Sequence, residues 1–92
     1  MNITAEQRDA VISEVYGELL KAFTDAELGQ GTESKSYWRL HNLNQPTFFR
    51  LAEMIQDMRL GHTTRAHQEQ MHEEFKLAAT YLVSAHLTTI PV

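Results

Sequence analysis

Residues 69–87 read EQMHEEFKLAATYLVSAHL, and their apolar positions recur with the period of an α-helix. At 100° per residue, these positions and one histidine fall within an arc of about 100°. They are Met71, Phe75, Ala78, Ala79, Leu82 and His86. The polar residues that face away are Glu69, Glu73, Thr80 and Ser84. Thr63 or Thr64 is a suitable N-terminal cap. The segment therefore predicts an amphipathic helix over residues 64–87.

A second apolar stripe, upstream of this helix, predicts a helix over residues 46–60. Pro46 suits the first helical turn, where its missing backbone N–H does no harm, and Gly61 suits the position after the last turn. The stripe repeats at intervals of one, three and four residues: Phe48, Leu51, Ala52, Ile55 and Met58. We expect this face to join the core.

Two neighbouring rows of apolar residues predict a further helix over residues 5–28. One row is Val11, Val15, Leu19 and Phe23, and the other is Ile12, Tyr16 and Leu20. Thr4 followed by Gln7 fits a capping box, and Gly29 fits a C-terminal cap. Because the two rows cover about half of the helix circumference, we expect this helix to contact two neighbours at once.

The connection between these helices is partly ambiguous. Residues 29–36 read GQGTESKS, which is typical of a loop. Residues 37–43 read YWRLHNL and fit either a short helix or an extended segment, because a window of seven residues does not separate the two periods. A helical turn is the favoured interpretation. The whole chain, residues 1–92, is predicted to form a single all-α domain, a bundle of three to four helices.

The composition excludes several classes of protein. The chain has 92 residues, 42% hydrophobic and 22% charged, which fits one globular domain and not a disordered chain. It contains no cysteine, so neither a disulfide framework nor a thiolate zinc site is expected. No apolar run reaches the roughly 18 residues of a membrane span, and the first residues do not resemble a signal peptide. We expect a soluble, cytoplasmic protein with no membrane partner.

The net charge of −4 is unevenly distributed along the chain. Residues 1–33 sum to −5, residues 34–65 to +3 and residues 66–92 to −2. The basic middle segment also holds aromatic residues, a combination typical of surfaces that contact acidic or phosphate groups. Its candidate partner-binding residues are Lys35, Tyr37, Trp38, Arg39, Phe49 and Arg50. In the alternative interpretation, the aromatics belong to the core and the arginines only neutralise the acidic first helix.

A second candidate contact surface is the acidic outer face of the first helix, formed by Glu14, Glu18 and Asp25. Such carboxylates can imitate nucleic-acid phosphates toward a basic partner protein. Several apolar residues also fall outside the helical stripes or beside a loop: Trp38, Phe49, Leu60, Leu77 and Tyr81. Exposed aromatic and leucine side chains are typical of interfaces with another protein or with a second copy of the chain.

Patterns for catalysis or metal binding are weak. Glu69 and His72 have the Glu-x-x-His spacing of di-iron helix bundles, but the sequence holds only one copy. His62, His67 and His72 follow one another at intervals of five residues and progress around a helix instead of converging. His86 is interpreted as a core histidine. The sequence has neither a Gly-x-Ser-x-Gly nucleophile elbow nor a Gly-x-x-x-x-Gly-Lys phosphate loop. We expect no enzyme activity, no metal and no cofactor.

These observations favour a small non-enzymatic module that binds another protein or forms a homodimer. In size, acidity and lack of cysteine the chain resembles phage- and plasmid-encoded inhibitors, including anti-CRISPR and anti-restriction proteins. This resemblance of composition implies an inhibitor or regulator of a host nucleic-acid-handling complex. Two alternatives stay open: a nucleic-acid-binding regulator that uses the basic middle segment, and a metal-binding helical protein that uses His67, His72 and Glu69.

Overall fold

The computed structural model describes residues 4–89 and, within them, the side chains of residues 4–85. Over this range the chain forms four helices and no strand: α1 (Ala5–Glu27), α2 (Lys35–Leu43), α3 (Gln45–Arg59) and α4 (Arg65–Thr89). The prediction of a small all-α bundle is therefore confirmed. None of these helices combines the length and the apolar character that crossing a membrane requires.

The two long helices begin at threonines that the sequence predicts as caps. At α1, Thr4 Oγ1 accepts from the Gln7 N–H at 3.1 Å, and Gln7 Oε1 accepts from the Thr4 N–H at 2.9 Å. This reciprocal pair is the predicted capping box. At α4, Thr64 Oγ1 accepts from the His67 N–H at 3.2 Å. Each hydroxyl satisfies a backbone donor that the first helical turn leaves unpaired.

Helix α2 settles the segment that was ambiguous in the sequence, because residues 37–43 are helical. The helix begins two residues earlier, inside the predicted loop, where Ser34 Oγ accepts from the Tyr37 N–H at 3.2 Å. Asn44 ends α2 and also caps α3, since its Oδ1 accepts from the Thr47 N–H at 3.2 Å. A single residue therefore separates the two helices, and the chain changes direction sharply between them.

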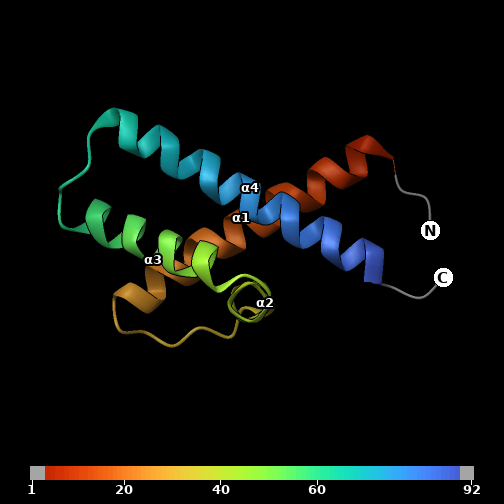
Figure 1. The fold of residues 1–92 in the computed structure, drawn as a ribbon, viewed down its shortest axis with the longest axis horizontal. Helices are drawn as coiled ribbons and strands as arrows, with labels where there is room; N and C mark the ends of the chain where they lie inside the picture. Colours follow the sequence, from red (N-terminus) through yellow and green to blue (C-terminus); the bar gives the residue numbers. More distant parts are fainter. Residues whose placement is uncertain (1–3, 90–92) are drawn as a thin grey trace.

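The helices form an elongated bundle of 45 × 26 × 19 Å. Figure 1 shows α1 and α4 running in opposite directions and crossing near the middle of the molecule. Helix α3 returns beside α4 on one side of this crossing, and α2 lies across the lower edge, where it is seen end-on. Arg8 donates to Ser84 Oγ at 2.9 Å, and the Tyr16 hydroxyl contacts His72 Nδ1. These contacts join α1 to α4 at two levels.

One aromatic ring from each helix meets at the centre of the core. The ring of Phe23 in α1 lies 4.9 Å from that of Tyr37, 5.0 Å from Phe48 and 5.6 Å from Phe75, measured between centroids. Buried aliphatic side chains and one methionine complete the core: Leu19, Ala22, Leu40, Leu51, Ile55, Met71, Ala78, Ala79, Leu82 and Val83. The predicted stripes of α3 and α4 thus face the core, although His86 lies outside the described side chains. This four-ring cluster contacts every helix.

The prediction that α1 contacts two neighbours along its apolar face holds only for its C-terminal half. The buried residues among those described in α1 are Leu19, Ala22 and Phe23, whereas Val11 is 42% exposed. The reason is the position of α3, which reaches the last turn of α1, where Arg59 donates to the Glu27 carbonyl oxygen at 3.1 Å. Figure 1 shows the first turns of α1 extending beyond α2 and α3.

Candidate functional site

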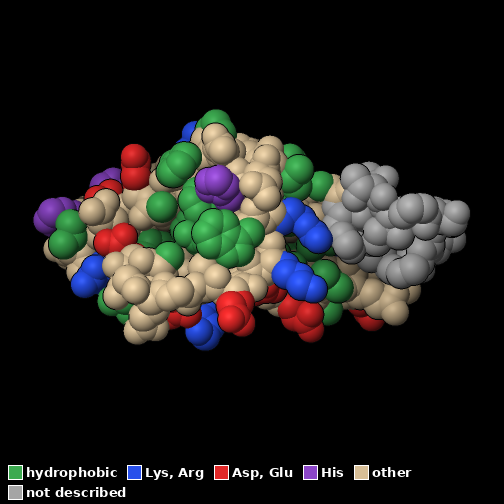
Figure 2. All heavy atoms as spheres, turned by 90° about the horizontal axis from the view of Figure 1, so that it is seen from below, with side chains coloured by type: hydrophobic (Ala, Val, Ile, Leu, Met, Phe, Trp, Pro, Cys, Tyr) green, Lys and Arg blue, Asp and Glu red, His purple; other side chains and the backbone are tan. Residues whose placement is uncertain are grey.

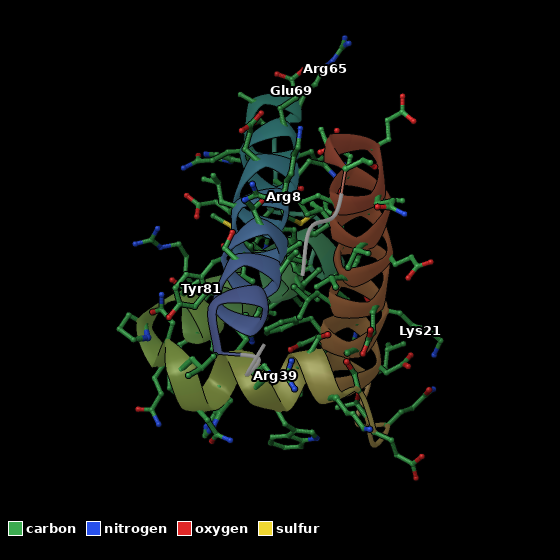
Figure 3. All side chains as sticks on the ribbon, turned by 90° about the vertical axis from the view of Figure 1, so that its right-hand side faces the viewer. Arg8, Lys21, Arg39, Arg65, Glu69 and Tyr81 are labelled. Atoms are coloured by element: carbon green, nitrogen blue, oxygen red, sulfur yellow. The ribbon has the colours of Figure 1, made fainter. Side chains whose placement is uncertain are left out.

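Three residues of the predicted basic-aromatic segment lie together on the outer face of α2. Lys35, Trp38 and Arg39 are all exposed, and their spacing of three and four residues places them on one side of the helix. They line a shallow groove together with residues of the preceding loop, the end of α2 and α4: Glu33, Asn42, Leu43 and Ala85. Figure 3 shows Arg39 at the opposite end of the view from Arg65 and Glu69.

Trp38 is the half-exposed centre of this surface. Its side chain is 49% exposed, yet its Nε1–H donates to the Thr32 carbonyl oxygen at 3.1 Å. Its ring also meets the ring of Tyr37 edge-on, with centroids 4.9 Å apart. These contacts fix the ring before any partner arrives, so binding would cost less side-chain entropy than it would for a mobile tryptophan.

The surface continues from α2 to α3 through two more rings. The His41 ring centroid lies 6.1 Å from that of Trp38 and 6.2 Å from that of Phe49, which is 55% exposed. Figure 2 shows hydrophobic, histidine and basic side chains gathered on one face of the molecule. We call this surface the α2 face, formed by Lys35, Trp38, Arg39, His41, Asn42, Leu43 and Phe49.

Three members of the α2 face were not assigned to it from the sequence: His41, Asn42 and Leu43. The sequence feature that could have assigned them is their helical spacing from Trp38 and Arg39. Once residues 35–43 are known to be helical, His41 falls three residues after Trp38, and Asn42 falls three residues after Arg39. This spacing could not be used from the sequence alone, because residues 37–43 also fitted an extended segment, in which residues three apart do not share a face.

Two predicted contact residues do not belong to the α2 face. The side chain of Tyr37 is only 8% exposed, because the helix turns it about 100° away from Trp38 and into the core. Arg50 projects toward α4 instead, where its Nη1 lies 3.4 Å from Oε2 of Glu74. The alternative interpretation, in which these aromatics belong to the core, therefore holds for Tyr37 but not for Trp38.

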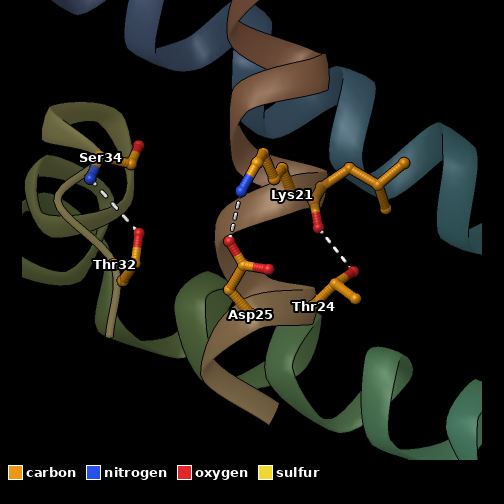
Figure 4. Close-up of polar contacts among 6 residues, drawn as sticks. Lys21, Thr24, Asp25, Thr32 and Ser34 are labelled. Carbon is orange, nitrogen blue, oxygen red and sulfur yellow. Dashed lines mark hydrogen bonds and ion pairs between the residues drawn. The ribbon is translucent and has the colours of Figure 1, made fainter. Parts of the chain in front are cut away.

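The acidic residues of α1 are partly engaged in contacts within the molecule. Lys21 Nζ donates to Asp25 Oδ2 at 2.6 Å, one helical turn along α1 (Figure 4). Ser34 Oγ donates to Glu18 Oε1 at 2.6 Å, which links α1 to the start of α2. Glu14 is exposed. Two of the three predicted carboxylates therefore have a structural role in this fold, whatever else they contact.

The residues considered as metal ligands do not converge on one point. His72 Nδ1 contacts the Tyr16 hydroxyl, whereas Glu69 forms an ion pair at 3.7 Å with an arginine of the same helix. His62 and His67 line a shallow depression between α3 and α4. Within the described part of the chain, no group of three or more His, Cys, Asp or Glu side chains is placed to hold a metal ion.

The remaining apolar residues predicted outside the stripes are indeed exposed. Leu60 is 57% exposed, Leu77 61% and Tyr81 42%. Figure 3 shows Tyr81 projecting from α4 on the side away from α1. These residues add exposed apolar surface outside the α2 face.

Comparison with known proteins does not assign the chain to a family. No protein-family model, no curated protein and no solved structure matches it. The resemblance to phage- and plasmid-encoded inhibitors therefore stays a prediction from composition. The activity of the protein has to be inferred from its own surface.

Proposed function

We propose that this protein is a small non-enzymatic module that binds another protein through its α2 face. The observation that carries the proposal is Trp38, which is half-exposed yet held by a hydrogen bond and an edge-on ring contact. Tryptophan, tyrosine and arginine are the residues that most often dominate the binding energy of protein interfaces. Trp38 lies between Lys35 and Arg39 on α2 and the exposed Phe49 on α3, so this surface offers aromatic area and positive charge together.

In its narrower form, the proposal is an inhibitor or regulator of a nucleic-acid-handling complex in the cytoplasm. Such a protein acts by occupying a surface of its target. Lysine and arginine on the α2 face would then form charge-assisted hydrogen bonds with carboxylates of that surface. The experiment described next also distinguishes two other ligands of the α2 face. One is a nucleic acid, whose phosphates the same cations would contact, and the other is a second copy of the chain.

Capture of partners from a lysate of the source cells, with and without nuclease treatment, tests this proposal. The wild-type protein is compared with Trp38→Ala and Phe49→Ala, which remove exposed aromatic area from the α2 face. Glu14→Lys is the matched control, because it changes an exposed residue of α1. We expect the wild type and the Glu14→Lys variant to retain a protein after nuclease treatment, and both aromatic variants to lose it.

Three results would overturn the proposal. Loss of every partner after nuclease treatment would assign the surface to a nucleic acid. Retention by both aromatic variants with loss by Glu14→Lys would move the contact to α1. A dimer seen by light scattering that dissociates in both aromatic variants would assign the α2 face to a second copy. Circular dichroism shows for each variant that the helices are intact.

A further inference from the structure

The groove of the α2 face changes in character along the helix axis. Glu33 and Lys35 lie at the start of α2, Trp38 and Arg39 in its middle and Leu43 at its apolar end, and Ala85 of α4 also lines the groove. Lys35 and Leu43 are eight residues apart, which corresponds to about 12 Å along a helix. A ligand about two helical turns long therefore spans the groove. It needs charged groups at one end and apolar groups at the other.

The position of Lys35 is unfavourable for folding and favourable for binding. It is the first residue of α2, where the positive end of the helix dipole disfavours a cation. Arg39 follows one turn later, so the two cations are spaced like two carboxylates four residues apart on a helix. Lys35 is exposed and points into the groove lining, where a negatively charged ligand would compensate for its position.

The charge in the groove favours carboxylates over a chain of phosphates. A phosphate backbone is bound by several cations that track it, and affinity scales with the number of phosphates neutralised. Here two cations share the groove with the carboxylate of Glu33 and the apolar side chain of Leu43. A protein segment that combines a few carboxylates with apolar residues matches this mixture better than a continuous polyanion does.

Resting on the proposed function, we infer that the α2 face binds an acidic, amphipathic segment of the partner protein. Carboxylates one turn apart lie over Lys35 and Arg39, and an apolar side chain packs against Trp38 and Leu43. The acidic end of the segment lies over the start of α2 and its apolar end over the last turn. This order along the segment is a requirement that a nucleic acid does not meet.

Selection from a displayed library of random 16-residue peptides tests the inference without knowledge of the partner. Three forms of the full chain are used: the wild type, Lys35→Glu combined with Arg39→Glu, and Lys76→Glu as a control on α4. We expect the wild type and the Lys76→Glu variant to enrich peptides with two acidic residues and, toward one end, leucine or an aromatic residue. The doubly reversed variant should enrich lysine and arginine at the acidic positions.

Trp38 provides an independent readout, because it is the single tryptophan of the chain. Binding of an enriched peptide should shift its fluorescence emission to shorter wavelength as the exposed ring leaves water. Single Lys35→Glu should weaken binding of that peptide at least tenfold, and its fold should be intact, because a carboxylate suits the first turn of a helix. The single variant Lys35→Glu therefore still tests the inference if the double variant does not fold.

The inference is overturned if no peptide is enriched, or if the wild type and the doubly reversed variant enrich the same peptides. It is also overturned if a single-stranded oligonucleotide of 20 thymidines binds more tightly than every enriched peptide. Failure here is distinguishable from failure of the proposed function. A partner protein that the lysate experiment shows to depend on Trp38 and Phe49 would leave the protein-binding role intact, with a ligand of different chemistry.

Discussion

Phe48 and Phe49 illustrate how one step along a helix decides the environment of a residue. Phe48 is 6% exposed and its ring lies 5.0 Å from that of Phe23, whereas Phe49 is 55% exposed and belongs to the α2 face. Successive side chains on a helix point about 100° apart, so two identical residues face the core and the solvent. Residue type alone therefore does not separate core from contact surface here.

Phe75 and Leu77 allow the difference between a buried and an exposed residue to be measured through the free energy of unfolding. Phe75 is fully buried and contacts Phe23, whereas Leu77 is 61% exposed on the same helix. We expect Phe75→Ala to lower the free energy of unfolding by about 3–5 kcal/mol, because it leaves a cavity at the four-ring cluster. Leu77→Ala should change it by no more than about 0.5 kcal/mol. Urea unfolding of both variants checks this, and equal losses would contradict the assigned burial.

Two tyrosines that pack in or against the core, Tyr37 and Tyr16, predict how the free energy of unfolding depends on pH. Burial raises the pKa of Tyr16 and of Tyr37 above the ordinary value of 10.0. Because the pKa is higher in the folded state than in the unfolded state, each burial of a neutral tyrosine stabilises the fold. This stabilisation is fully present below pH 10 and is lost as pH rises through the folded-state pKa. Urea unfolding between pH 8 and 11 should show the decrease, and Tyr37→Phe should reduce it. Equal decreases in the wild type and in Tyr37→Phe would contradict the assignment of the effect to Tyr37.

At the scale of the element, α2 determines whether the site exists at all. Only a helix over Lys35–Leu43 brings Lys35, Trp38 and Arg39 to one side and sends Tyr37 into the core. Two cap residues hold this short helix, Ser34 at its start and Asn44 at its end. Isolated helices of this length are unstable in water, so α2 depends on these caps and on packing against the other helices.

Removal of the Ser34 hydroxyl should therefore loosen the element that carries the site. Its Oγ accepts from the Tyr37 N–H and donates to Glu18, and both contacts are lost in Ser34→Ala. We expect a loss of about 0.5–2 kcal/mol in the free energy of unfolding. Amide hydrogen exchange should become faster in α2 first. Ser13→Ala, at an exposed position of α1, is the control, and equal effects of the two changes would show that the cap is unimportant.

The sequence predicts where the helices form better than it predicts how they pack against one another. The periodic stripes of α3 and α4 and the capping box at Thr4 are confirmed, because local spacing and backbone hydrogen bonding determine them. The exposure of Val11 was not predictable, since the periodicity of α1 is the same whether α3 covers four turns or one. Similarly, Tyr37 and Trp38 could be assigned to core and surface only once the rotation of α2 was known.

At the scale of the whole molecule, the protein carries opposite charges in different regions. Residues 1–33 sum to −5, whereas the middle segment that includes the α2 face sums to +3. This asymmetry was evident from the sequence, but the structure divides the basic residues differently. Arg50 and Arg59 lie away from the groove and pair with Glu74 and Glu27, whereas Lys35 and Arg39 are the basic residues that line it.

This charge distribution predicts the kinetics of binding to an acidic partner. The acidic α1 repels such a partner at long range, and the α2 face attracts it at short range. We expect Glu14→Lys to raise the association rate constant roughly two- to tenfold at low salt, with little change in dissociation. Lys35→Glu should lower the association rate constant and also speed dissociation, because it changes the contact itself.

Surface plasmon resonance with the captured partner, at 0.05 and 0.5 M salt, separates these effects. The gain from Glu14→Lys should disappear at the higher concentration, because charges more than a few ångströms apart are screened there. The faster dissociation of Lys35→Glu should persist, since screening acts less on a contact from which water is excluded. Slower association of Glu14→Lys at low salt would mean that the partner is basic and approaches α1, and the assignment of the contact to the α2 face would then be wrong.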